Sequence, residues 1–99
     1  MRFVISKEAK IDLENIWLYT FENWSQAQAD RYVNLVFEEI ELISEEPLTG
    51  IDYSHVRKGY YKTRVKSHFI FYRINEKLEE IEVIRILHQQ MDIDSHLTE

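Results

Sequence analysis

The 99-residue sequence contains no cysteine, only one proline and only two glycines. Without cysteine the chain cannot form a disulfide, hold a metal through thiolates or use a cysteine nucleophile, and this composition suits the reducing cytoplasm. The scarcity of glycine and proline excludes long flexible linkers. Because 44% of the residues are hydrophobic and 30% are charged, as in ordinary globular proteins, we expect residues 1–99 to form a single folded domain.

Long apolar runs and familiar catalytic motifs are also absent. No run approaches the roughly 18 apolar residues of a membrane span, so no membrane contact is expected. The opening residues 2–6 run directly into Lys7 and Glu8, which argues against a signal peptide and favours a cytoplasmic protein. The sequence has no Gly-rich phosphate loop, no Gly-x-Ser-x-Gly elbow and no His-Glu-x-x-His. Motifs alone therefore give no evidence for an enzyme or a cofactor.

The net charge of −6 is unevenly distributed. Residues 1–55 carry four Lys/Arg against eleven Asp/Glu, residues 56–88 carry eight against four, and residues 89–99 carry none against three. Overall acidity argues against direct binding to DNA or RNA, since phosphate contacts depend on Lys and Arg. The positive middle segment leaves open an acidic protein partner or a focused phosphate contact.

Two helices are predicted in the first half of the chain. Ser6 stands where an N-cap belongs, and apolar residues at helical spacing predict a helix over 7–23. Ser25 and Gln28 have the spacing of a capping box, which predicts a second helix over 26–44 and hence an αα-hairpin. The charged residues of the first helix are expected to face solvent: Lys10, Asp12, Glu14 and Glu22.

Strands are predicted at the start of the chain and throughout its second half. Residues 3–5 are apolar and β-branched, which indicates a first strand. After a loop over 48–59, the hydrophobic period changes from 3.6 to 2, and strands are predicted over 60–66, 68–74 and 81–88. Three sequential strands with short turns predict an antiparallel meander with the hairpin packed on one face, an α+β fold.

Lys62, Arg64 and Lys66 alternate along one predicted strand. The alternation places three cations on one face, roughly 6.5–7 Å apart, where their mutual repulsion is expected to exclude an apolar core. One interpretation is a solvated outer face. The other is a docking stripe for an acidic segment or for phosphates.

Arg85 lies inside an otherwise apolar strand. Because an unpaired buried charge costs several kcal/mol, its guanidinium must either form a structural salt bridge or point into a functional groove. His68 and His88 each flank an apolar strand and are expected to be structural hydrogen-bonding residues. No metal site is expected from the repeat of His88, Asp92 and His96, because a helical face drifts by about 40° over each four-residue step.

The two tryptophans and the C-terminal tail carry apolar side chains with two possible roles. Trp17 and Trp24 are interpreted as anchors of helix packing, although Trp24, at the turn between the helices, is also placed to contact a partner. The tail contributes Met91, Ile93 and Leu97 beyond the last strand. These residues either cover the protein's own sheet or form part of a contact surface.

The order of strand, αα-hairpin, loop and meander comes with two specific segments, residues 68–73 (His-Phe-Ile-Phe-Tyr-Arg) and 84–92 (Ile-Arg-Ile-Leu-His-Gln-Gln-Met-Asp). Together they resemble the ParE-type toxins of the RelE/ParE superfamily, often called plasmid-stabilisation proteins. Residues 3–9 and 12–17 are also similar to the start of that family, so the resemblance covers nearly the whole chain. It implies a RelE/ParE-like fold and a type II toxin that forms a hetero-oligomer with a co-expressed, ParD-like antitoxin.

The resemblance implies two alternative targets. ParE-like toxins are associated with inhibition of DNA gyrase by protein contact, whereas RelE-like relatives cleave mRNA on the ribosome. Cleavage would require a base, an acid and a basic cluster, and the residues available for that role are Arg64, Arg85 and His88. We favour gyrase, because no tyrosine follows Tyr72, where the cleaving relatives typically have a late aromatic residue, and because the chain is acidic. A non-toxic relative that still binds an antitoxin is a third possibility.

Site residues are expected in two groups. The residues expected to contact the antitoxin are Lys62, Arg64, Lys66, Trp17 and Trp24. The residues expected to contact the target are Arg85, His88, Met91 and Ile93.

Overall fold

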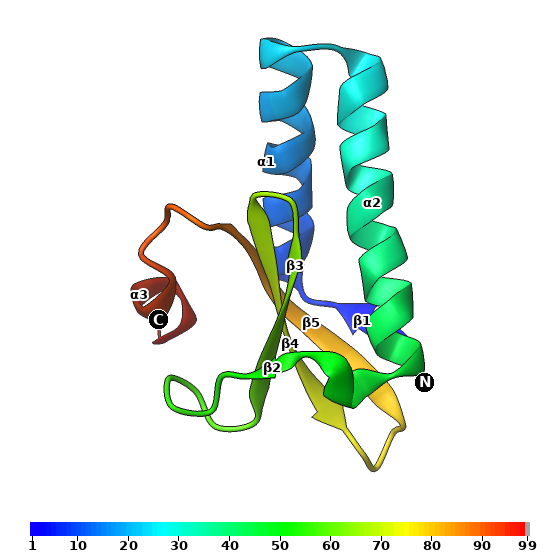
Figure 1. The fold of residues 1–99 in the computed structure, drawn as a ribbon, viewed down its shortest axis with the longest axis vertical. Helices are drawn as coiled ribbons and strands as arrows, with labels where there is room; N and C mark the ends of the chain where they lie inside the picture. Colours follow the sequence, from blue (N-terminus) through cyan, green and yellow to red (C-terminus); the bar gives the residue numbers. More distant parts are fainter. Residues whose placement is uncertain (99) are drawn as a thin grey trace.

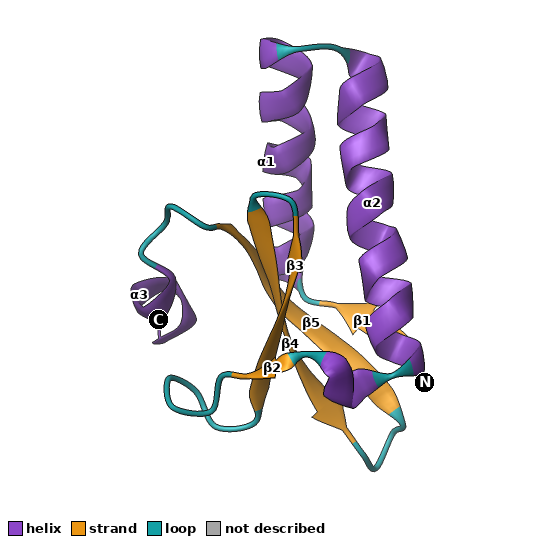
Figure 2. Cartoon of the chain, in the orientation of Figure 1, coloured by secondary structure: helices purple, strands orange, loops and turns teal. Residues whose placement is uncertain are grey.

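A computed structural model describes residues 1–98 and shows an α+β domain (Figures 1 and 2). Its elements, in chain order, are β1 (Arg2–Ile5), α1 (Lys7–Asn23), α2 (Gln26–Glu45), the 3-10 helix η1 (Pro47–Thr49), β2 (Ile51–Asp52), β3 (Tyr60–Val65), β4 (His68–Asn75), β5 (Glu80–His88) and α3 (Ile93–Thr98). The predicted hairpin and meander are confirmed, and no helix lies within residues 60–88. None of the helices described is both long and apolar enough to cross a membrane.

Both long helices begin where the sequence predicted, because serine caps hold their first turns. The Ser6 hydroxyl accepts a hydrogen bond from the Ala9 amide at 3.0 Å, and the Ser25 hydroxyl accepts one from the Gln28 amide at 3.1 Å. These bonds satisfy backbone donors that have no partner within the helix. α2 extends one residue beyond the predicted end, to Glu45.

The sheet has the order β1-β5-β4-β3-β2. β3, β4 and β5 form the antiparallel meander, and β1 adds a parallel strand at the β5 edge. α1 and α2 pack on one face of this sheet at their base, while their connected ends project beyond it (Figure 1). The hairpin is therefore supported along only part of its length.

Apolar residues are buried on both faces of the sheet, although the cations of β3 were expected to exclude an apolar core from one of them. The larger cluster lies between the helices and the sheet and includes Ile40 and Tyr72. A smaller cluster, which includes Tyr60 and Leu97, lies on the opposite face and is covered by the loop after β2 and by α3. α3 was not predicted: Leu97 is only 4% exposed, so this part of the tail covers the protein's own sheet.

Candidate functional site

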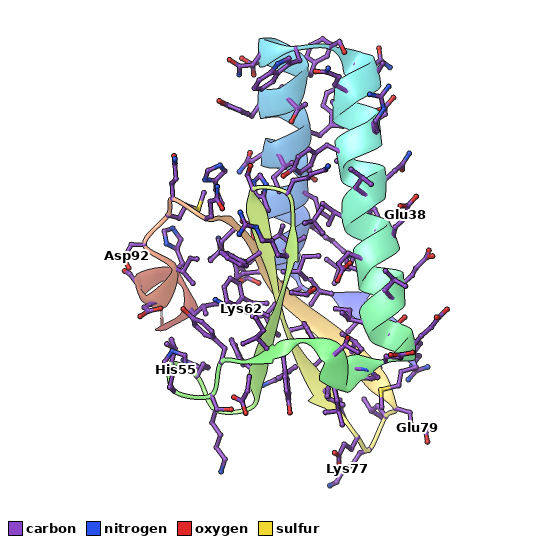
Figure 3. All side chains as sticks on the ribbon, in the orientation of Figure 1. Glu38, His55, Lys62, Lys77, Glu79 and Asp92 are labelled. Atoms are coloured by element: carbon purple, nitrogen blue, oxygen red, sulfur yellow. The ribbon has the colours of Figure 1, made fainter. Side chains whose placement is uncertain are left out.

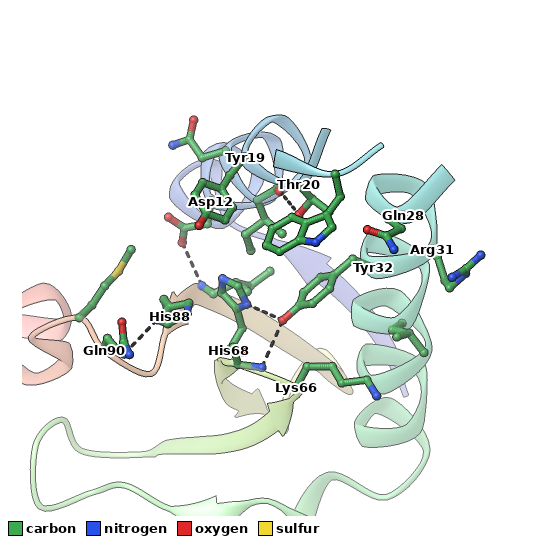
Figure 4. A pocket seen from close by; sticks show the side chains of 17 residues that line it. Asp12, Tyr19, Thr20, Gln28, Arg31, Tyr32, Lys66, His68, His88 and Gln90 are labelled. Carbon is green, nitrogen blue, oxygen red and sulfur yellow. Dashed lines mark hydrogen bonds between the residues drawn. The ribbon is translucent and has the colours of Figure 1, made fainter. Parts of the chain in front are cut away.

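A groove of about 820 Å³ lies between the projecting part of the hairpin and the adjacent end of the sheet (Figure 4). We call it the hairpin groove. α1 lines it with a helical face that includes Asp12, Ile16 and Tyr19, whose spacing of four and three residues places them on one side of the helix. The other lining residues come from α1 itself, the helix turn, α2 and the ends of β3, β4 and β5 with the segments that follow them: Asn15, Thr20, Trp24, Gln28, Arg31, Tyr32, Leu35, Lys66, Ser67, His68, Ile86, His88, Gln90 and Met91.

Two aromatic side chains remain unusually open at the hairpin groove. Trp24 and Tyr19 are each 63% exposed, and their rings meet edge to face with centroids 6.1 Å apart. Met91, 46% exposed, lines the same groove. Large aromatic side chains such as these, once buried by a partner, typically contribute most of the energy of a protein interface.

Asp12 fixes the wall of the hairpin groove. It was expected to face solvent, but its side chain is largely buried. Its carboxylate accepts hydrogen bonds from Nε and Nη2 of Arg85 and from the Ile86 amide, each at 2.9 Å. The side chains of Asp12 and Arg85 are 11% and 19% exposed. β1 pairs with β5 only as far as Val83, so the next part of the β5 edge is left to α1. Of the two interpretations of Arg85, the structural salt bridge is the one observed.

Tyr32, His68 and His88 form an aromatic cluster in the hairpin groove, in which Tyr32 and His68 are hydrogen-bonded to each other (Figure 4). Tyr32 Oη lies 2.7 Å from Nδ1 of His68, and the rings of His68 and His88 meet edge to face at 5.1 Å. Burial, and secondarily the neighbouring His88, lower the pKa of His68 to about 4. His68 is therefore neutral near pH 7. The prediction that it serves as a structural hydrogen-bonding residue agrees with this geometry.

The predicted stripe of three cations is divided between two faces. Lys66 does not belong to β3: it begins the turn to β4 with a left-handed φ of 53°, and it lines the hairpin groove. Lys62 and Arg64 point to the opposite face, where Lys62 Nζ lies 4.5 Å from the centre of the Phe69 ring. The placement of all three on one face is therefore wrong. So is the expected exclusion of an apolar core, because Tyr60 on that face is buried.

The three residues considered for RNA cleavage are not brought together. Arg64 lies over Phe69 on the face away from α1 and α2, and Arg85 is paired with Asp12. His88 lines the hairpin groove. The arrangement gives them no shared cluster in which one reacting phosphate would meet a base, an acid and an unpaired guanidinium.

The other expected site residues also separate. Trp17 donates a hydrogen bond from Nε1 to Asp30 at 2.8 Å and stacks on Phe21, so it joins the two helices outside the groove. Ile93 packs against the smaller core cluster. Sequence reasoning missed Tyr19, Tyr32 and Leu35 as groove residues; for Tyr19, its helical spacing from Asp12 was an available signal.

Comparisons with known proteins agree with this architecture. Residues 3–93 match a family described as the ParE toxin of type II toxin–antitoxin systems, parDE. The chain is 38% identical to Toxin ParE1 of Caulobacter vibrioides over 94% of each chain, and 35% identical to Toxin ParE1 of Mycobacterium tuberculosis over 97% of each.

Solved structures share the fold at low sequence identity. One is described as a chromosomal ParDE TA system from P. aeruginosa, with a TM-score of 0.76 and 17% identity over 89% of this chain and 95% of that one. Another is a YoeB/ParE toxin from Agrobacterium tumefaciens, with a TM-score of 0.64 and 21% identity over 89% and 98%.

Replacing Asp12 with alanine should lower the free energy of unfolding by on the order of 3 kcal/mol, because it removes the carboxylate that accepts hydrogen bonds from the largely buried Arg85 guanidinium and from the Ile86 amide. Arg73→Ala is the matched control: it breaks a salt bridge in which the arginine side chain is 52% exposed, and should cost below about 1 kcal/mol. Urea denaturation measures both. The double variant Asp12→Ala/Arg85→Met should recover part of the loss, and equal costs for the two single variants would contradict the assignment.

His68 should make stability depend on pH. Its pKa falls from 6.5 in the unfolded chain to about 4 in the folded protein, so its contribution is complete above pH 6.5 and is lost as the pH falls toward 4. Unfolding free energies measured between pH 6.5 and pH 5 should decrease less steeply for His68→Gln than for the wild type. The exposed His55→Gln control should keep the wild-type slope; a common slope for all three proteins would rule out His68 as the cause.

Proposed function

Because this chain belongs to the ParE toxin family of type II toxin–antitoxin systems, we propose that a ParD-like antitoxin holds it inactive and that the released toxin inhibits DNA gyrase by protein–protein contact. The observation that carries this proposal is the hairpin groove, with its exposed Trp24 and Tyr19. The groove supplies a binding surface, whereas the residues considered for catalysis lie apart.

The hairpin groove has the chemistry to accept an amphipathic helix from the antitoxin. Leu35, Trp24 and Met91 offer apolar contacts, while Arg31 and Lys66 place cations among the lining residues. A helix with an aliphatic face and acidic flanks satisfies both features, in the helix-in-groove mode of recognition. Such a segment can be disordered alone and fold as it binds. Of the cations expected to contact the antitoxin, we retain Lys66.

Competition for one surface explains how the antitoxin would silence the toxin. His88 and Met91, both expected to contact the target, lie in the same groove as Trp24. An antitoxin helix seated there would cover them, so gyrase and antitoxin would exclude each other. In this proposal Arg85 supports the groove wall through Asp12, and Ile93 anchors the tail from which Met91 projects.

Purified protein can distinguish gyrase inhibition from RNA cleavage. We expect the chain to inhibit DNA supercoiling by gyrase, or to accumulate gyrase-cleaved DNA, at concentrations that leave cell-free translation unchanged. Addition of the antitoxin should restore supercoiling. Codon-level cuts in ribosome-bound mRNA with full gyrase activity would refute the proposal in favour of a ribonuclease. Activity in neither assay, with the antitoxin still bound, would instead indicate a non-toxic antitoxin-binding relative.

Trp24→Ala should weaken antitoxin binding by roughly 10- to 100-fold, because it removes a large, exposed aromatic side chain from the proposed interface. Leu18→Ala is the matched control, since Leu18 is 48% exposed on α1 but does not line the groove. Isothermal titration calorimetry gives both dissociation constants. If the Leu18 variant loses as much affinity as the Trp24 variant, the antitoxin docks elsewhere on the hairpin.

A further inference from the structure

A second candidate surface lies on the sheet face that points away from α1 and α2, and we call it the cation platform: Lys62, Arg64, Phe69 and Tyr53. Lys62 Nζ lies over two rings, 4.5 Å from the centre of Phe69 and 4.8 Å from that of Tyr53. The Arg64 guanidinium lies over the same Phe69 ring at 5.6 Å. Figure 3 shows Lys62 on the side of β3 that faces α3.

Contacts with the protein itself fix the Arg64 guanidinium in place. Its Nε donates to the Lys66 carbonyl at 2.8 Å, and its Nη2 donates to Oε1 of Gln89 at 2.5 Å. Neither Lys62 nor Arg64 forms a salt bridge within the part of the chain that the structure describes. The platform therefore presents two positive charges whose positions are set in advance, which reduces the entropy lost when an anion binds.

We propose that the cation platform is a docking site for an acidic, extended segment of a partner protein. Lys62 and Arg64 are alternate residues of one strand, so their Cα atoms are roughly 6.5–7 Å apart. The same spacing separates alternate side chains of an extended peptide. Two carboxylates in an acidic-x-acidic pattern can thus pair with the two cations while Phe69 packs beneath them. The two cations of the platform also belong to the positively charged segment 56–88 of an otherwise acidic chain, so charge complementarity selects an acidic partner.

The same contacts disfavour single-stranded nucleic acid. Proteins that bind single strands offer open aromatic faces on which bases stack. Here Lys62 and Arg64 already lie over the Phe69 ring, and Lys62 also lies over Tyr53. α3 adds one acidic group at the border, since Tyr53 Oη donates a hydrogen bond to Asp94 at 2.8 Å. A long polyanion meets this negative border, whereas a short acidic peptide segment does not need to cross it.

The cation platform and the hairpin groove lie on opposite faces of the sheet. A partner held at the platform therefore leaves the groove open, and an antitoxin in the groove leaves the platform open. Only the statement that an antitoxin occupies the groove rests on the proposed function. Recognition of an acidic segment by the platform does not depend on whether gyrase is the target.

Fluorescence anisotropy with the full chain tests the platform. The probe is a labelled ten-residue peptide of alternating glutamate and serine; a glutamine–serine peptide and a deoxythymidine ten-mer serve as comparisons. We expect the acidic peptide to bind at low salt and to dissociate as salt is raised. Lys62→Glu/Arg64→Glu should weaken binding at least about tenfold. Lys10→Glu/Lys77→Glu, which changes the net charge equally elsewhere, should retain binding within about twofold.

Each alternative result identifies what is wrong. Equal losses in the two charge-reversed variants would show that only the net charge of the protein matters. Tighter binding of the DNA ten-mer than of the acidic peptide would indicate a nucleic-acid site. No binding of the acidic peptide would refute the proposal. Loss of peptide binding on addition of antitoxin would show that the platform belongs to the antitoxin interface. The neutral variant Lys62→Gln/Arg64→Gln should show an intermediate loss of affinity for the acidic peptide. Its fold is checked by circular dichroism, so that a loss of affinity in the charge-reversed variant is not mistaken for the effect of misfolding.

Discussion

The Asp12 carboxylate is the contact on which the arrangement of hairpin and sheet depends. It accepts two hydrogen bonds from Arg85 and one from the Ile86 amide, just beyond the point where β1 stops pairing with β5. Ser6 contributes to the same attachment, because its hydroxyl donates a hydrogen bond to the Ile84 carbonyl of β5 and also caps α1. The edge of β5 therefore passes from a strand partner to a helix partner without leaving its backbone groups unpaired.

The groove follows from where this attachment lies. Asp12 fixes α1 near the sheet, and the large core cluster holds α2 along its C-terminal half through Val36, Ile40 and Ile43. Beyond that level the helices rely mainly on each other, as in the hydrogen bond from Trp17 to Asp30. The projecting end thus forms one wall of a groove whose other wall is the end of the sheet. A rigid base with an open end leaves apolar surface accessible without requiring the domain to unfold.

The sequence predicts the parts of the fold that depend on local chemistry. Serine caps and the change of hydrophobic period near Gly59 place both long helices and the meander correctly, because these signals act within a few residues. The site depends on distant contacts instead. Asp12 reaches a residue 73 positions away, so no local pattern distinguishes it from the solvent-facing charges of α1. Likewise α3 is too short to be stable alone and exists where Leu97 finds an apolar surface to cover.

The alternation of side chains between the two faces of a strand holds only as far as the strand extends. Here the end of β3 at Val65 decides on which face each of the three cations lies. Lys66 continues the sequence pattern of Lys62 and Arg64, but its left-handed φ turns it toward the groove. The positive segment consequently serves two surfaces of unlike chemistry. The hairpin groove is largely apolar, so binding there should draw mainly on hydrophobic burial and respond weakly to salt. The opposite face presents cations that lie over the Phe69 ring, so an anion bound there is held by electrostatic attraction, which salt screens. Binding at the two surfaces should therefore differ in its dependence on ionic strength.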